Sequence, residues 1–67
     1  NAVAPGPVDT DLFRSGKDAA AIQRSAGMSP LNRVGEPEEV GNVVAFLASG
    51  KSSWIDGQIV QTNGGMV

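Results

Sequence analysis

The stretch PEEVGNVVAFLAS, residues 37–49, carries the clearest structural pattern in the chain. Its large apolar residues recur at i, i+3, i+4 and i+7, the spacing that places side chains on one face of a helix. They are Val40, Val43, Val44 and Leu47, and Phe46 widens the stripe. Pro37 suits the first helical position, where a missing N–H leaves no bond unmade. We therefore predict a helix over residues 37–49, with Gly50 as its left-handed cap.

Three glutamates, Glu36, Glu38 and Glu39, crowd the start of this helix. Carboxylates in a first turn face the positive end of the helix dipole, so their presence there is favourable. A metal site or acid/base pair is the alternative interpretation of such a cluster. We favour the helix-start role and expect Arg33 to pair with one of these carboxylates or with a main-chain carbonyl.

Short apolar segments flank this helix at both ends of the chain. Residues 1–4 run into Pro5-Gly6-Pro7, which is typical of a buried strand that stops at a breaker cluster. Residues 58–62 predict a second strand, closed by the turn Asn63-Gly64-Gly65. Two such short strands form a stable sheet only with other strands between or beside them. The helix would then cover one face of an α/β sheet.

The stretch between the first strand and the helix is less regular. Asp9, Thr10 and Asp11 are all candidate helix caps. Residues 18–26 are rich in alanine and predict two helical turns that end near Gly27. Residues 11–28 as a whole are either helical or a loop with helical pieces.

Composition narrows the classes of function. The 67 residues contain no cysteine and no histidine, which excludes a disulfide scaffold, a zinc finger, a thiolate nucleophile and a Ser-His-Asp triad. A net charge of −2 and three aromatic residues disfavour nucleic-acid binding. The apolar runs are too short for a membrane span, and we expect a cytoplasmic protein. So short a chain buries little surface, so it relies on a partner or belongs to something larger.

Three blocks of the sequence resemble the C-terminal part of the classical short-chain dehydrogenases/reductases. Residues 1–10 resemble the family's strand and Pro-Gly motif, and residues 30–40 resemble the entry into its penultimate helix. Residues 55–65 resemble its last strand and Gly-Gly end. The blocks follow one another in family order and cover most of the chain, and residues 11–29 are unmatched. The resemblance implies part of a doubly wound, Rossmann-like parallel α/β sheet.

The resemblance also implies a function, namely hydride transfer between NAD or NADP and a carbonyl or alcohol substrate. The implied cofactor-binding residues are Pro5, Gly6, Val8 and Thr10. Val8 would meet the nicotinamide carboxamide through its main chain, and Thr10 would offer its hydroxyl to the carboxamide or to a phosphate. The hydrophobic substrate lid would include Leu12, Phe13 and Met28, with ordinary packing as the alternative. Gly16 and Gly27 are candidate hinges for this lid.

Under this interpretation the chain is one partial domain with four parts. Residues 1–8 are the strand end and cofactor loop, and residues 9–29 are the lid. Residues 30–50 are a linker and helix, and residues 51–67 are the last strand and tail. The family's catalytic Ser and Tyr-x-x-x-Lys have no counterpart here, since the chain has no tyrosine. We therefore expect no catalytic residue and no activity in these 67 residues alone. The family usually has Asp where Asn63 stands.

We expect three kinds of partner: a small carbonyl or alcohol substrate, the remainder of the parent enzyme, and further copies of the same protein. The resemblance implies a homodimer or homotetramer formed through the 37–49 helix and the 58–62 strand. Trp54 would seal a subunit or core boundary, or stack on substrate. The alternative is a truncated, non-catalytic module that associates with itself through the same apolar helix face and edge strand.

Overall fold

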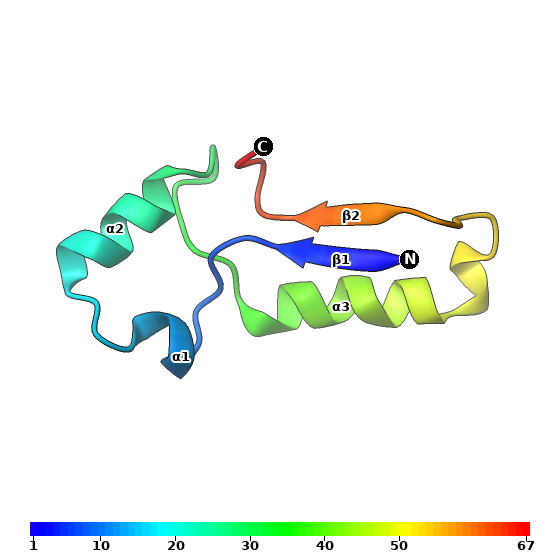
Figure 1. Ribbon diagram of the computed structural model, residues 1–67, viewed down its shortest axis with the longest axis horizontal. Coiled ribbons are helices and arrows are strands. Elements are labelled where there is room, and N and C mark those ends of the chain that lie inside the picture. Colours follow the sequence, from blue (N-terminus) through cyan, green and yellow to red (C-terminus); the bar gives the residue numbers. More distant parts are fainter.

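Two parallel strands lie side by side at the centre of the molecule, described here for all 67 residues from a computed structural model (Figure 1). Strand β1 spans Ala2–Pro5 and strand β2 spans Ile59–Thr62. Their register pairs Ala2 with Ile59 and Pro5 with Thr62. Because the two strands are direct neighbours, any further strands of the sheet must lie beside this pair and not between its members.

The side chain of Asn1 fixes the start of the strand pair. Its Nδ2 donates to the carbonyl of Ile55 at 3.1 Å, and its Oδ1 accepts from the Gln58 N–H at 2.9 Å. The Ala2 N–H then donates to the Gln58 carbonyl at 2.8 Å. One asparagine therefore aligns the incoming chain of β2 with β1 before the ladder begins.

Helix α3, Pro37–Ala48, runs alongside β1 and confirms the predicted helix (Figure 1). Glu38 and Glu39 occupy its first turn, and Glu39 Oε1 accepts the Glu36 N–H at 2.9 Å. This bond satisfies a main-chain donor that precedes the helix, as in a capping box. The apolar stripe is divided between two environments. Val40, Val43 and Leu47 are half-buried, whereas Val44 and Phe46 are exposed.

The C-terminal end of α3 differs from the prediction, because Gly50 is not a left-handed cap. Ser49 ends the helix in an extended conformation (φ −89°, ψ 163°), and Gly50 begins a short 3₁₀ helix, η1, that spans Gly50–Ser52. Two serine hydroxyls satisfy the last carbonyls instead. Ser49 Oγ donates to the Phe46 carbonyl at 2.6 Å, and Ser52 Oγ donates to the Leu47 carbonyl at 2.8 Å. These two side-chain hydrogen bonds replace the main-chain bonds that a glycine cap with a positive φ would make.

Two short helices lie beyond the carboxyl ends of the strands (Figure 1). Helix α1 spans Asp11–Arg14, and helix α2 spans Ala19–Gly27, which confirms the two helical turns predicted near Gly27. Thr10 Oγ1 caps α1 by accepting the Phe13 N–H at 3.1 Å. Asp18 caps α2 by accepting the Ala21 N–H at 2.8 Å. Residues 11–28 are thus two helices joined by a turn.

The chain encloses almost no core of its own. Only Ala26, Ser29 and Ser52 are buried, so a single apolar residue is removed from solvent. Trp54 is 100% exposed and fills no interior position within the chain. A stable fold therefore needs additional surface packed against these elements. None of the helices has the length and apolar character that crossing a bilayer requires.

Candidate cofactor and substrate site

The four residues predicted to bind cofactor, Pro5, Gly6, Val8 and Thr10, follow one another where β1 ends. An isolated parallel bridge between Val8 and Gly35 joins this loop to the segment that precedes α3. The Gly35 N–H donates to the Pro7 carbonyl at 2.9 Å, and the Asp9 N–H donates to the Gly35 carbonyl at 2.7 Å. Val8 therefore lies in a short parallel pairing with the segment that leads into α3. In open α/β sheets, ligands bind in the crevice at the carboxyl ends of strands.

The Val8 main chain keeps one hydrogen-bonding group free. Its carbonyl accepts the Thr10 N–H at 2.8 Å, but its own N–H has no partner within the chain. Thr10 Oγ1 uses a lone pair to cap α1, so its O–H proton is still available for donation. The two donors, one from the main chain and one from a side chain, are of the kind that a carboxamide or phosphate oxygen accepts.

Gly6 has a structural reason to be glycine. A Cβ added there would lie 2.8 Å from the Asn63 Cβ and 2.9 Å from the Asn63 Cα. Real Cβ atoms do not approach other carbons so closely, so the turn after β2 packs directly against the backbone of the cofactor loop. The Gly6 N–H also donates to the Thr62 carbonyl at 3.2 Å, which extends the ladder by one residue. A close approach of Gly6 to a cofactor remains a prediction.

The three predicted lid residues occupy different environments. Leu12 and Met28 are 88% and 57% exposed, so neither packs within the chain. Phe13 is half-buried, and Lys17 Nζ lies 4.5 Å from the centre of its ring. Lys17 Nζ also donates to the Phe13 carbonyl at 2.6 Å. The exposed apolar side chains leave a surface that a substrate or another part of a protein can cover.

An ion pair that sequence reasoning missed ties the cofactor loop to α1. The Arg14 guanidinium donates to Asp9 Oδ1, and this hydrogen bond lowers the pKa of the Asp9 carboxyl. The pair spans the helix cap at Thr10 and so links the loop to α1. Its two partners are five residues apart across an irregular segment, and no helical spacing rule marks them in the sequence.

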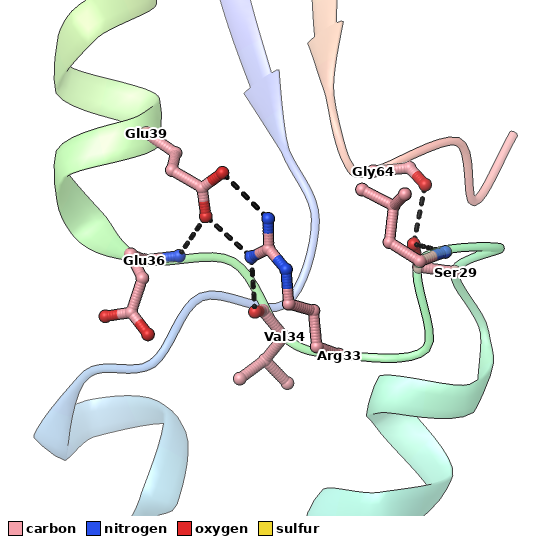
Figure 2. Close-up of polar contacts among 7 residues, drawn as sticks. Ser29, Arg33, Val34, Glu36, Glu39 and Gly64 are labelled. Atoms are coloured by element: carbon pink, nitrogen blue, oxygen red, sulfur yellow. Dashed lines mark hydrogen bonds and ion pairs between the residues drawn. The ribbon is translucent and has the colours of Figure 1, made fainter.

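A second ion pair lies at the start of α3 (Figure 2). Arg33 donates to Glu39 through both terminal nitrogens, at 2.7 Å to Oε1 and 3.0 Å to Oε2. Arg33 Nη1 also reaches the Val34 carbonyl at 3.2 Å. The expected partnership of Arg33 with a first-turn carboxylate is confirmed. No group of three or more acidic residues in the chain is arranged to hold a metal ion.

A cavity of about 240 Å³ lies between the strand ends, the start of α3 and the connection that precedes it. Thr62 Oγ1 is buried beside this cavity and has no hydrogen-bond partner. None of the predicted lid residues lines it. The lining combines Pro7 and Val8 of the cofactor loop with residues that were not predicted to form a site, among them Ser29, Thr62, Asn63 and Gly64. These segments are far apart in the sequence and meet only in the folded chain. No local sequence motif therefore predicts that they line one cavity.

Comparison with known families identifies the origin of this arrangement. A family model described as enoyl-(acyl carrier protein) reductase matches residues 1–67, the whole of the chain. The chain belongs to the short-chain dehydrogenase/reductase family. The predicted resemblance is thereby confirmed, and with it the placement of β1, α3 and β2 in a Rossmann-like α/β fold.

Members of the short-chain dehydrogenase/reductase family align along the full chain. A short-chain type dehydrogenase/reductase from Picea abies is 48% identical over 67 residues, which are 100% of this chain and 25% of that protein. A chloroplastic NADPH-dependent aldehyde reductase-like protein from Arabidopsis thaliana is 45% identical over 67 residues, again 100% of this chain and 25% of the relative. The chain thus spans about a quarter of the length of these curated relatives.

A solved structure from the same family superposes closely. A short chain dehydrogenase family protein from Francisella tularensis matches with a TM-score of 0.85 and 35% identity. The match covers 96% of this chain and 31% of that one. The match supports membership of the short-chain dehydrogenase/reductase family and the fold that goes with it.

Proposed function

We propose that these 67 residues serve an NAD(P)-dependent oxidoreductase that moves a hydride between nicotinamide and a carbonyl or alcohol substrate. The free Val8 N–H at the carboxyl end of β1, two residues from the Thr10 hydroxyl, is the observation that carries this proposal. The relative named as an NADPH-dependent aldehyde reductase-like protein makes reduction of an aldehyde by NADPH the first reaction to test. A cytoplasmic location is part of the same proposal.

The chain's contribution is orientation. The bound cofactor supplies the hydride. The Val8 N–H donates to the carboxamide oxygen, and the Thr10 hydroxyl donates to the carboxamide or to a phosphate oxygen. Val8 and Thr10 would thus hold the carboxamide end of the cofactor and limit its rotation. Orientation of this kind is what a protein normally adds to cofactor chemistry.

The proposed lid covers residues 9–29 and includes Leu12, Phe13 and Met28. The exposed apolar side chains of Leu12 and Met28 would pack against substrate and exclude water from the reacting carbon. The ion pair between Asp9 and Arg14 would keep α1 attached to the cofactor loop while the rest of the segment moves.

We assign the source of the proton that the substrate oxygen gains to a group outside this chain. The sequence has no tyrosine and no histidine, and neither Lys17 nor Lys51 follows a tyrosine. We therefore propose that residues 1–67 are inactive alone and that the remainder of the enzyme provides the acid/base group. A stand-alone module that only associates with itself is the competing proposal, and it predicts no response to a nicotinamide cofactor.

A series at Thr10 in the whole enzyme tests the binding role, because the residue has two separable functions. Thr10→Ser keeps both the helix cap and the hydroxyl donor. Thr10→Asp keeps the cap but has no proton to donate at neutral pH, and Thr10→Val loses both. We expect NADPH to bind about tenfold more weakly to the Asp and Val variants, the loss of one good hydrogen bond. Equal affinity in the wild type and the Asp variant would contradict the donor role.

The subunit interface is also part of the proposal. The exposed apolar residues on α3 and near β2 include Val44, Phe46, Trp54 and Ile59. Exposed apolar patches of this kind commonly mark contact surfaces. A homodimer or homotetramer formed through the 37–49 helix and the 58–62 strand would remove them from water.

A further inference from the structure

The turn after β2 touches both functional segments. On one side, Asn63 fills the space that a Gly6 side chain would need, at 2.8 Å from the Cβ position. On the other side, Gly64 packs against Ser29, the last residue of the proposed lid. A Cβ added at Gly64 would lie 2.7 Å from Ser29 Oγ. The turn therefore sets the spacing between the cofactor loop and the C-terminal end of the lid.

Ser29 is bonded to this turn by its side chain (Figure 2). Its Oγ donates to the Gly64 carbonyl at 2.5 Å, a contact between residues 35 positions apart, and accepts the Leu31 N–H at 3.1 Å. Ser29 is one of only three buried residues in the chain. Asn63 holds the acceptor in place, since its Oδ1 accepts the Gly65 N–H at 3.1 Å and the Met66 N–H at 3.2 Å.

The proposed lid has few other packing contacts with the rest of the chain. Ala26 is the only buried residue within α1 and α2, so neither helix has an apolar face packed on the sheet. The N-terminal end of the lid is attached through the bridge between Val8 and Gly35. The C-terminal end is attached through the Ser29 hydroxyl. The direction in which α1 and α2 project depends on these two attachments.

We propose that Ser29 is a positioning residue for substrate, acting through the lid. Its hydroxyl fixes the C-terminal end of the lid to the turn at Gly64, and loss of that bond lets the lid drift from the cofactor loop. This role rests on the proposed function, because it assigns residues 9–29 to the substrate lid. It requires substrate affinity to fall while cofactor affinity does not.

The test compares Ser29→Ala with Ser53→Ala in the whole enzyme. Ser53 is an exposed serine whose hydroxyl makes no hydrogen bond, so its variant controls for removal of a hydroxyl. The readouts are KM and kcat for hexanal with NADPH, and Kd for NADPH alone. We expect Ser29→Ala to raise KM about three- to tenfold, the range of one neutral hydrogen bond. Kd for NADPH should stay within about twofold, and Ser29→Thr, which keeps the hydroxyl, should restore KM.

A readout independent of catalysis accompanies the kinetics. Trypsin can cleave the lid after Arg14, Lys17 and Arg24. We expect Ser29→Ala to accelerate cleavage at these three sites, and Ser53→Ala to leave it unchanged. In a Gly64→Ala background, Ser29→Ala should accelerate cleavage less than it does in the wild type. The reason is that it removes the oxygen that the new Cβ at position 64 would contact too closely.

The outcomes separate the two proposals. Unchanged KM and unchanged cleavage in Ser29→Ala, relative to Ser53→Ala, would overturn the role of Ser29. A parallel loss of NADPH affinity would also overturn it, since that result indicates general disruption. If the wild-type enzyme oxidises neither NADPH nor NADH with hexanal or other aldehydes and ketones, the proposed function fails and the substrate-positioning role fails with it. The cleavage rates then still decide whether Ser29 holds this segment in place.

Discussion

Arg33 and Glu39 form a bidentate ion pair that joins the connection before α3 to the first turn of that helix. Two nitrogens of Arg33 meet two oxygens of Glu39 at 2.7 and 3.0 Å, and Glu39 also accepts the Glu36 N–H. Both side chains are about half exposed to solvent. The connection pairs with the cofactor loop through the bridge between Gly35 and Val8. The ion pair therefore links the position of α3 to the proposed site.

Stability should depend on pH through Glu39. The hydrogen bonds from Arg33, followed by that from the Glu36 N–H, lower the pKa of Glu39 from 4.5 to about 2. Because the folded-state pKa lies below the unfolded one, the carboxylate stabilises the fold above pH 4.5, and this contribution is lost as the pH falls toward 2. Melting temperatures of the whole enzyme and its Glu39→Gln variant should therefore converge on acidification. A constant difference between pH 7 and pH 3 would contradict the assignment.

Gly64→Ala should destabilise the enzyme more than Gly16→Ala. Both glycines have a positive φ, 64° and 73°, so both substitutions incur about 1–2 kcal/mol of backbone strain. Only Gly64 has a neighbour, Ser29 Oγ, at 2.7 Å from the new Cβ, whereas Gly16 has nothing within 4 Å. Denaturant unfolding measures the difference. Equal losses of unfolding free energy in the two variants would mean that the turn shifts freely and makes no tight contact with Ser29.

Ser52→Ala should cost about 1 kcal/mol of unfolding free energy, the typical net value of a hydrogen bond. The Ser52 hydroxyl donates to the Leu47 carbonyl at 2.8 Å from a position that is 4% exposed, so its removal leaves a helix carbonyl unpaired. Ser53→Ala, one residue along on the exposed side, is the matched control. Equal stability of the two variants would show that serine hydroxyls do not replace a glycine cap at the end of α3.

Trp54→Ser should weaken self-association of the whole enzyme. A fully exposed tryptophan is typical of an interface anchor, and loss of such anchors commonly costs about 2 kcal/mol or more. Analytical ultracentrifugation over a dilution series should show dissociation at a protein concentration about tenfold higher or more. Leu12→Ser removes an exposed apolar side chain from the proposed lid and should leave assembly unchanged. Equal shifts in both variants would argue against a specific contact at Trp54.

The elements set by local chemistry were predictable from the sequence. Helix α3 follows from its apolar spacing, from Pro37 at its start and from the acidic first turn, all of which act within a few residues. Strand β2 follows from its apolar residues and the Asn63-Gly64-Gly65 turn, where both glycines indeed have positive φ. The error at Gly50 has the same local origin, because serine and glycine are competing ways to satisfy a helix end.

The site was predictable only in part. Val8 and Thr10 were singled out through resemblance to a family, not through any pattern of their own. The contacts that hold the site together join distant residues, as Val8 joins Gly35 and Ser29 joins Gly64. No periodicity marks such pairs, since they exist only after β1 and β2 have paired. The unpartnered Thr62 Oγ1 is likewise visible only when the strand ends have been packed.

The proposed function depends most directly on the contact between the Val8 main-chain N–H and the nicotinamide. Amide hydrogen exchange of the whole enzyme, labelled with ¹⁵N-valine, measures this directly in the presence and absence of NADPH. We expect NADPH to slow exchange at Val8 well beyond any change at Val60, which lies within the β2 ladder. Slower exchange elsewhere in the enzyme with no change at Val8 would contradict the claim.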